Sequence, residues 1–286
     1  MSPIKLGRFK MFPIVASRFR LDGGSMFGVV PKVLWGKKAN ADKLNRIVVN
    51  LNAILVETDS ARILIESGMG QLSKRDREIF CSEEKEIGMA LIENGFDPHS
   101  IDFVILTHLH FDHAGGCTTF SDNGEIVPVF PRAKHIIQGS EWNASVKPHP
   151  LVMGSYKTQE LLSLESSGLV MIINGGYEVL PGIKIEKTGG HSPGHQVVWI
   201  ESDGKVALYP GDLVPMAAHL RLRWISSWDL EPLRVYAEKE RILERCVRDD
   251  AIVFFPHDPS IIGCRIKEEG EYSFFPLEDS IIFAGS

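Results

Sequence analysis

The chain has 286 residues, of which 44% are hydrophobic, and its formal net charge is −6. A chain of this length can bury a large core, and acidic and basic residues are spread over both halves without a basic cluster, so we expect no nucleic-acid partner. A bilayer span needs about twenty apolar residues in a row. No such run occurs, so we expect no membrane partner.

Signals of export and of domain division are absent from the sequence. The first thirty residues contain no uninterrupted apolar stretch followed by a small-residue cleavage site. Four scattered cysteines, Cys81, Cys117, Cys246 and Cys264, are too sparse for a disulfide framework, and reduced, buried thiols favour the cytoplasm. Gly and Pro fall singly between short apolar runs, so we predict a single domain over residues 1–286.

In chain order, the first predicted elements are two strands over residues 48–57 and 62–66, joined by the polar turn 58–60. A helix over 83–94 ends at Gly95, and a buried strand over 101–107 follows. Further short runs rich in β-branched or aromatic residues predict strands at 134–138, 170–173, 183–187, 196–200, 206–209 and 252–255.

A longer amphipathic helix begins at Pro232. Val235, Ile242 and Cys246 fall on its apolar stripe, whereas Glu238 and Lys239 are expected on its outer face. Many strands with helices between them fit two sheets packed face to face with helices outside, and they also fit a doubly wound sheet. Periodicity alone does not choose between these two α/β architectures.

Four side chains that can bind metal follow the strand 101–107 within six residues: His108, His110, Asp112 and His113. A continuing strand would send His110 and His113 to opposite faces, so the backbone has to fold back after the strand. Single histidines are more often structural than functional, but four such side chains at the end of a buried strand indicate a metal site.

Three further candidates each follow a predicted strand and stand next to Gly or Pro. His191 follows Gly189-Gly190, Asp212 follows Pro210-Gly211, and His257 follows Pro256. Each signal is weak alone, since Asp after Gly is usually a turn residue. Their order and spacing behind the first cluster give them weight.

This pattern, HxHxDH followed by a His, an Asp and a final His on separate strand ends, resembles the metallo-β-lactamase superfamily over roughly residues 47–258. The resemblance implies an αββα four-layer sandwich, the metallo-β-lactamase fold. It also implies that His108, His110 and His191 bind one metal ion, that Asp112, His113 and His257 bind a second, and that Asp212 bridges them.

Imidazole and carboxylate ligands without thiolate predict two divalent metal ions, with zinc as the default and manganese, iron, cobalt or nickel also compatible. The implied function is a hydrolase in which a metal-bridging hydroxide attacks an ester, lactone or related acyl or phosphoryl bond of a small molecule. Asp112 would pass the proton to the leaving group. His219 is a second catalytic candidate, as an acid or oxyanion donor, and His195 is expected to pack or hydrogen-bond nearby.

Within the superfamily the sequence looks most like the lactonase and organophosphate hydrolase branch. Quorum-quenching lactonases carry a tyrosine three residues after the bridging Asp, where this chain has Pro215, so that contact with the leaving group is missing. Apolar residues are expected to wall a pocket above the metals, namely Phe27, Trp35, Met216, Leu220, Trp224, Ile225 and Trp228. A homodimer remains open, since exposed aromatic residues serve an interface equally well.

Two other functions stay open. A mononuclear iron persulfide dioxygenase shares much of this motif but leaves the second metal position empty, so the number of metal ions per chain separates it from the hydrolase. A ligand-binding protein that kept the fold and lost catalysis is the other, although none of the seven ligand positions is missing here.

Overall fold

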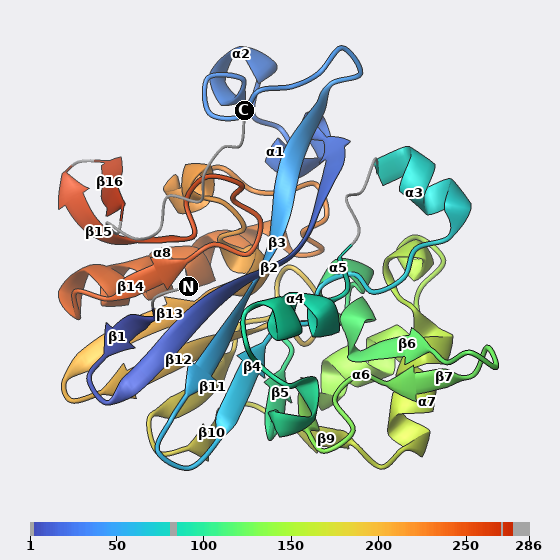
Figure 1. Ribbon diagram of the computed structural model, residues 1–286. Coiled ribbons are helices and arrows are strands. Elements are labelled where there is room, and N and C mark those ends of the chain that lie inside the picture. Colours follow the sequence, from blue (N-terminus) through green and yellow to red (C-terminus); the bar gives the residue numbers. More distant parts are fainter. Residues whose placement is uncertain (1–2, 81–84, 270, 277–286) are drawn as a thin grey trace.

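A computed structural model describes residues 3–80, 85–269 and 271–276. The first sheet has the strand order β1-β2-β3-β4-β5-β8-β9, and the second has the order β10 to β16 in sequence (Figure 1). The strands of the first sheet are β1 (Ile4–Leu6), β2 (Phe9–Asp22), β3 (Arg46–Glu57), β4 (Arg62–Ile65), β5 (Phe103–Ile105), β8 (Lys134–Gln138) and β9 (Val170–Ile173). A separate two-stranded sheet pairs β6 (Thr118–Phe120) with β7 (Ile126–Pro128).

The second sheet is antiparallel except where β13 and β14 run parallel. Its strands are β10 (Tyr177–Leu180), β11 (Ile183–Lys187), β12 (Gln196–Ser202), β13 (Lys205–Tyr209), β14 (Ile252–Phe254), β15 (Gly263–Glu269) and β16 (Glu271–Pro276). The α-helices are α1 (Gly23–Phe27), α2 (Lys32–Trp35), α3 (Lys74–Phe80), α4 (Ile87–Glu93), α5 (Phe111–Ala114), α6 (Gly139–Val146), α7 (Thr158–Ser166) and α8 (Pro232–Arg248). Short 3₁₀ turns are η1 (Pro98–Ser100), η2 (Gly115–Cys117), η3 (Met153–Ser155), η4 (Gly211–Leu213) and η5 (Ala217–Leu220).

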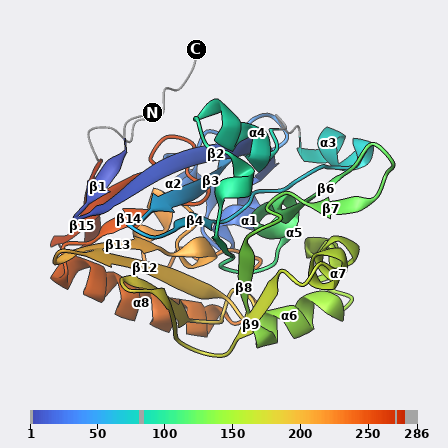
Figure 2. The same cartoon turned by 60° about the horizontal axis from the view of Figure 1, so that its bottom comes forward.

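Three apolar clusters define four layers. The cluster between the sheets joins side chains such as Ile65 and Ile105 of the first sheet to Val198 and Phe254 of the second. A second cluster packs the outer face of the first sheet against helices, and a third packs the second sheet against α8. Figure 2 shows these layers edge-on, with α8 beneath β12 and β13 and α4 on the opposite side. The predicted αββα sandwich is therefore confirmed.

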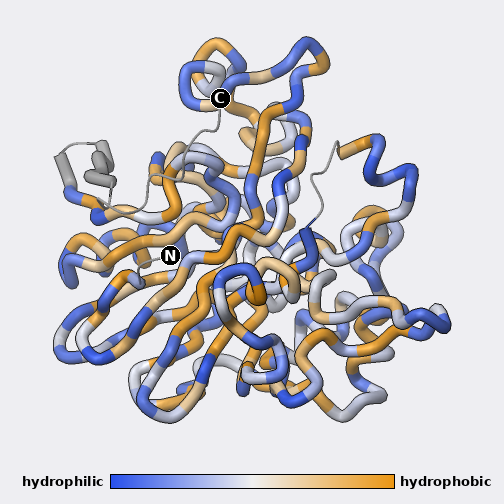
Figure 3. Tube along the Cα trace, in the orientation of Figure 1, coloured by the Kyte–Doolittle hydropathy of each residue, from blue (hydrophilic) through white to orange (hydrophobic). Residues whose placement is uncertain are grey.

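The hydrophobic segments in Figure 3 follow the strands into these layers, while most connecting loops are polar. The predicted hairpin of β3 and β4 is present, and the helix predicted from Pro232 is α8. In α8, however, Lys239 is only 1% exposed, so its predicted position on the outer face is wrong. A segment after β13 covers this side of α8, and the carbonyl oxygen of Trp224 accepts a hydrogen bond from Lys239 Nζ (2.6 Å).

The cysteines and two further elements can be compared with what the sequence predicts. The thiols of Cys117, Cys246 and Cys264 are free and buried, as predicted, whereas Cys81 lies outside the described residues. The helix predicted over 83–94 begins at Ile87 in the described part of the chain. The long strand β2, which pairs with β3 along twelve positions, was not predicted. No helix among the described residues is long and apolar enough to cross a bilayer.

Candidate metal centre

The four candidates of the first cluster stand at the end of β5. His108 and His110 follow the strand directly, and Asp112 and His113 lie in the short helix α5, which turns the chain back as predicted. Two glycines make this turn fit. A Cβ on Gly115 would lie 2.2 Å from the carbonyl oxygen of Met69, too close for any other residue.

The other three candidates come from the second sheet. His191 lies in the loop between β11 and β12, Asp212 lies in η4 after β13, and His257 follows β14. Gly211 precedes Asp212 with φ +53°, and a Cβ there would lie 2.7 Å from the ring of His195. The facing edges of both sheets thus bring all seven predicted ligands together.

These side chains form three overlapping groups: two match the predicted ligand sets, and the third joins His108, His113 and Asp212 between them. His108, His110 and His191 form the first, with Nε2 of His108 and Nε2 of His191 at 3.0 and 3.1 Å from Nδ1 of His110. Asp112, His113 and His257 form the second, with the two Nε2 atoms 3.1 Å apart. Four ligands held about 2.0 Å from a zinc ion lie about 3.3 Å from one another, so these spacings suit a tetrahedral ion.

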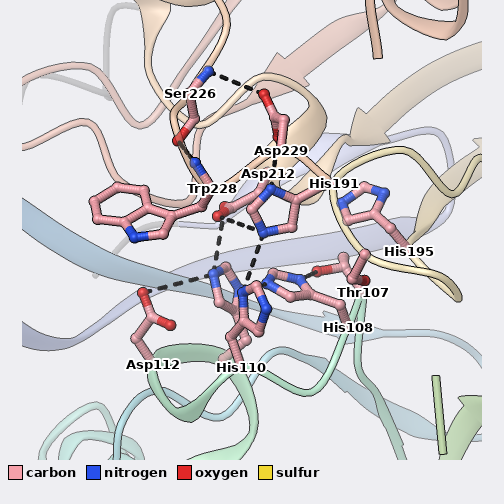
Figure 4. Close-up of polar contacts among 12 residues, drawn as sticks. Thr107, His108, His110, Asp112, His191, His195, Asp212, Ser226, Trp228 and Asp229 are labelled. Atoms are coloured by element: carbon pink, nitrogen blue, oxygen red, sulfur yellow. Dashed lines mark hydrogen bonds and ion pairs between the residues drawn. The ribbon is translucent and has the colours of Figure 1, made fainter. Parts of the chain in front are cut away.

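Asp212 stands between the two groups. Its Oδ2 lies 3.4 Å from Nε2 of His191, and its Oδ1 lies 3.1 Å from Nε2 of His257 and 3.3 Å from Nε2 of His113 (Figure 4). Each carboxylate oxygen therefore faces a different group.

The outer nitrogens of two ligand histidines are hydrogen-bonded in a way that suits metal binding. Nδ1 of His191 donates to Asp229 Oδ1 (2.7 Å), and Nδ1 of His257 donates to the Asn50 carbonyl (3.0 Å). Because each proton sits on the outer nitrogen, the inner nitrogen presents a lone pair to its neighbours. Lone pairs that face one another at about 3 Å repel unless a cation lies between them, so the residues present fit divalent ions.

Burial and charge set the protonation states of the centre. Burial and the neighbouring imidazoles hold the pKa of His108 and of His110 well below the usual value, which keeps both rings neutral. Burial alone would raise the pKa of Asp212, but the surrounding histidines hold it well below the usual range. Burial would lower the pKa of the other three ligand histidines, but the carboxylate of Asp212 raises it above the usual value. A neutral imidazole and an ionised carboxylate are the forms that bind a metal, so His108, His110 and Asp212 are in their metal-binding forms and a metal ion would displace the protons that Asp212 favours on the other three rings.

Two carboxylates that position the ligand histidines were not predicted. Asp229, on the segment before α8, holds His191, and Glu66, at the end of β4, places its Oε2 3.3 Å from Nδ1 of His113. Both carboxylates are nearly inaccessible to solvent. A carboxylate at the end of the apolar strand 62–65 was the available signal for Glu66, whereas nothing in the sequence near Asp229 points to its partner.

His219 does not lie where the sequence analysis placed it. The residue is 0% exposed, its Nε2 donates to the carbonyl of Met26 (3.0 Å), and its ring stacks on Phe27 at 5.0 Å. Burial lowers the pKa of His219 to about 3. This neutral ring is part of the packing beside η5, and it is not among the residues that line the pocket at the metal centre.

His195 takes the packing position expected of it. It is fully buried, and its Nδ1 lies 2.7 Å from the hydroxyl oxygen of Thr188. Figure 4 shows its ring beside the cluster, behind His191.

A pocket of about 270 Å³ opens onto the metal centre. Its polar lining includes ligands from both groups, and its apolar walls are Phe19, Leu21, Met26, Phe80, Phe111 and Trp228. Among the predicted wall residues only Trp228 is correct. Phe27 and Trp35 are fully buried and stack on each other at 5.2 Å, and Trp224 packs edge-on against Phe27.

Met216 and Leu220 line a different cavity, of about 390 Å³, between η5 and residues 258–261. Ile225 lines neither space. The walls of the pocket at the metal centre come instead from β2, α1 and the end of α3. Of these segments only α1, through Phe27, was connected with the site from the sequence.

Comparisons with known proteins agree with this geometry. Residues 46–257 match the family model of the metallo-beta-lactamase superfamily. The chain is 30% identical over 240 residues to an N-acyl homoserine lactonase of Bacillus cereus, which covers 75% of this chain and 84% of the relative.

Solved structures show the same relationship. A probable metal-dependent hydrolase from Staphylococcus aureus has a TM-score of 0.88 at 31% identity, covering 97% of this chain and 100% of that one. An N-acyl homoserine lactone hydrolase with the product N-hexanoyl-L-homoserine at its catalytic metal centre has a TM-score of 0.69 at 25% identity, covering 90% and 95% of the two chains. The chain therefore belongs to the metallo-beta-lactamase superfamily, and it is a metal-dependent hydrolase.

Proposed function

We propose that this protein is a dinuclear metal-dependent hydrolase that opens the lactone or ester bond of a small, uncharged molecule. The observation that carries the proposal is the position of Asp212, whose two oxygens face two separate groups of ligands. A mononuclear site needs only one such group. We further propose that one domain carries the whole site, because both sheets contribute ligands.

In this proposal His108, His110 and His191 hold one divalent ion, Asp112, His113 and His257 hold the other, and Asp212 bridges them. Nitrogen and oxygen ligands in tetrahedral spacing favour zinc, and manganese, iron, cobalt and nickel accept the same ligands. When bound, a pair of divalent ions supplies a hydroxide nucleophile near neutral pH and polarises the carbonyl oxygen that is attacked.

Asp112 has the position to move a proton. Its Oδ2 lies 3.7 and 3.8 Å from Nε2 of His257 and of His113, and its side chain, 16% exposed, lines the pocket. One carboxylate oxygen can therefore face the ligand cluster while the other stays accessible to a substrate in the pocket. Asp112 accepts the proton of the attacking water and delivers it to the leaving oxygen as the acyl bond breaks. His219 has no part in this step because its ring is held by Met26.

The pocket supports a neutral substrate with an apolar part. Its walls include three phenylalanines and Trp228, and none of the described lining residues is Lys or Arg. Its volume of about 270 Å³ fits a small molecule. The similarity to N-acyl homoserine lactonases supports a lactone, the class of bond that those relatives cleave by name.

The position three residues after Asp212 is occupied by Pro215, whose carbonyl accepts a hydrogen bond from the backbone of His257 (2.9 Å). It therefore offers the substrate no donor. Trp228 lies on the same side of the cluster as Asp112 and Asp212 (Figure 4) and lines the pocket. Among the described residues its indole N–H has no hydrogen-bond acceptor. We propose that this N–H contacts the oxygen of the substrate in place of the missing tyrosine.

Metal analysis together with an assay panel tests the function. Purified protein is analysed for metal per chain and assayed with an aryl ester, a lactone and an aryl phosphotriester. We expect two ions per chain and lactone or ester turnover. A single iron without hydrolysis would favour the persulfide dioxygenase, and two ions without turnover on any substrate would favour a ligand-binding member of the fold.

Variants separate the roles of the carboxylates. Asp212→Ala should lose both bound ions and turnover, because both ligand groups share this residue. Asp112→Asn should lower kcat far more than metal content, because the amide cannot accept the proton. His99→Ala, on an exposed turn, is the matched control and should change neither. Full turnover by Asp112→Asn would remove its proposed role.

A further inference from the structure

Three distant segments are tied together around α1, beside the mouth of the pocket. Gly23 donates its backbone N–H to the carbonyl of Asn45 (2.8 Å), and Asn45 Nδ2 donates to Asp22 Oδ2 (3.0 Å). On the other side, the N–H of Ser227 donates to the carbonyl of Ser25 (2.9 Å). Residues 29–35, 42–46 and 225–230 therefore border one helix, whose own Met26 lines the pocket.

This border exposes an unusual amount of apolar surface. Val29 is 95% exposed, and Val33, Leu44, Leu34, Leu230 and Trp228 are 72%, 68%, 48%, 44% and 39% exposed. Single exposed apolar residues are ordinary, but a group of six on adjoining segments marks an interaction surface. The surface is held in place, since Trp35 of α2 stacks on Phe27 and its ring fills the space beside Gly23.

Positive charge lies on these segments and directly beside them in the chain. Lys32 and Lys43 are exposed on the segments themselves, and the exposed cations Lys37, Lys38 and Arg223 lie within three residues of them. Residues 22–46 contain five cations and two acids, a charge of +3 in a chain of −6. Of the two acids, Asp42 forms an ion pair with Arg46 (2.8 Å), and Asp22 accepts the hydrogen bond from Asn45. We call the six apolar residues and these five exposed cations the α1 rim. Figure 1 shows α1, α2 and the loop after α2 at one end of the molecule, beyond the sheets, and Figure 3 colours this part of the backbone with both hydrophobic and hydrophilic residues.

We propose that the α1 rim docks the protein on an anionic lipid surface. Valine, leucine and tryptophan side chains among lysines are the composition that enters the boundary of a bilayer while the cations contact acidic headgroups. A symmetric contact with a second copy would bring together two surfaces that each carry a charge of +3, which costs free energy. This positive charge in an acidic chain therefore favours an anionic partner surface over a second copy.

Docking at this face would bring the pocket next to the lipid. Trp228 belongs both to the α1 rim and to the pocket wall, and Met26 of α1 lines the same pocket. A substrate with an apolar tail that partitions into a bilayer would then reach the pocket without crossing much water. Binding of the α1 rim to lipid requires neither bound metal nor turnover of a substrate. The docking proposal can therefore be wrong while the proposed hydrolase function is correct.

Sedimentation with vesicles tests the proposal. The holoenzyme is mixed with vesicles of phosphatidylcholine alone or of equimolar phosphatidylcholine and phosphatidylglycerol. We expect it to sediment with the anionic vesicles only, and to be released as salt screens the headgroups. Lys37→Gln and Lys38→Gln should each weaken binding about fivefold. Val33→Glu should weaken it further while hydrolysis of a dissolved substrate stays unchanged, since Val33 does not line the pocket.

Leu151→Glu is the matched control, because Leu151 is also exposed, at 83%, but lies on the loop after α6. This variant should bind vesicles like the wild type. Equal sedimentation with neutral and anionic vesicles would overturn the proposal, as would binding that the substitutions in the α1 rim leave unchanged. A dimer in solution that Val33→Glu dissociates would also overturn it and assign the face to contacts between copies.

Discussion

A buried histidine away from the metal ligands makes the stability of this fold sensitive to mild acid. His135, on β8 next to the edge strand β9 of the first sheet, is 0% exposed, and burial lowers its pKa to about 4. In the unfolded chain the pKa returns to about 6.5, so the unfolded state binds a proton that the folded state refuses. The stability that the neutral ring contributes is complete above about pH 6.5 and is lost as the pH falls toward 4.

The size of the effect follows from the two pKa values. Between about pH 7 and pH 5 the unfolded ring becomes almost fully protonated and the folded ring stays almost neutral, so the free energy of unfolding falls by about 2 kcal/mol. His135→Leu removes this loss and places an apolar side chain beside Phe130, whose ring centroid lies 6.2 Å from that of His135. The variant should therefore lose about 2 kcal/mol less than the wild type over the same range.

Urea unfolding of both proteins at the two pH values, with metal removed by a chelator, measures this difference. Protonation of His219, whose pKa burial lowers to about 3, contributes equally to both proteins and cancels. His149→Leu, on an exposed turn after α6, is the control and should behave like the wild type. Parallel pH dependences of the wild type and His135→Leu would refute the reasoning.

Three further predictions concern the site. Asp229→Asn and Glu66→Gln should each weaken one of the two bound metal ions about 10- to 100-fold, as measured by competition with a chelator, and loss of both ions together in either variant would contradict two separate groups. Trp228→Phe should raise KM for a lactone by about tenfold, and an unchanged KM would exclude the indole N–H as a substrate donor. Lys239→Met should lower kcat/KM and weaken the ion on His191, because the segment that carries Asp229 loses its hydrogen bond to α8; an unchanged metal affinity would show that this anchor is not needed.

The sequence was sufficient to predict the side chains that can bind metal. His108, His110, Asp112 and His113 are recognisable because few other reasons bring four such residues together after a buried strand. The four layers also followed once the resemblance was stated, although periodicity alone left two architectures open. Local patterns thus predicted which residues meet at the centre.

The pocket walls could not be predicted in the same way. An aromatic side chain suits a pocket wall and a buried core equally well. Only the tertiary packing shows that Phe27, Trp35 and Trp224 pack on one another inside the core. Phe19 and Leu21 lie on a strand that pairs with β3 far along the chain, and this pairing decides which of their faces meets the site. Specificity therefore depended on contacts distant in sequence.

Lys239 shows the same limit. Its helical position and charge predict exposure, and a segment from another part of the chain covers it.

The division of the ligands between the two sheets has a consequence for the whole molecule. His108 and His113 belong to the end of the first sheet, whereas His191, Asp212 and His257 belong to the second, so each of the two proposed ions would join the two halves. Ions that bind only the folded protein would stabilise the contact between the two sheets. Each tenfold increase in the concentration of free ion should then add about 1.4 kcal/mol per site to the free energy of unfolding. At low metal concentration the two sheets would come apart first at the edge that carries the ligands. The supply of ions would therefore govern how long the protein stays folded as well as its rate of hydrolysis.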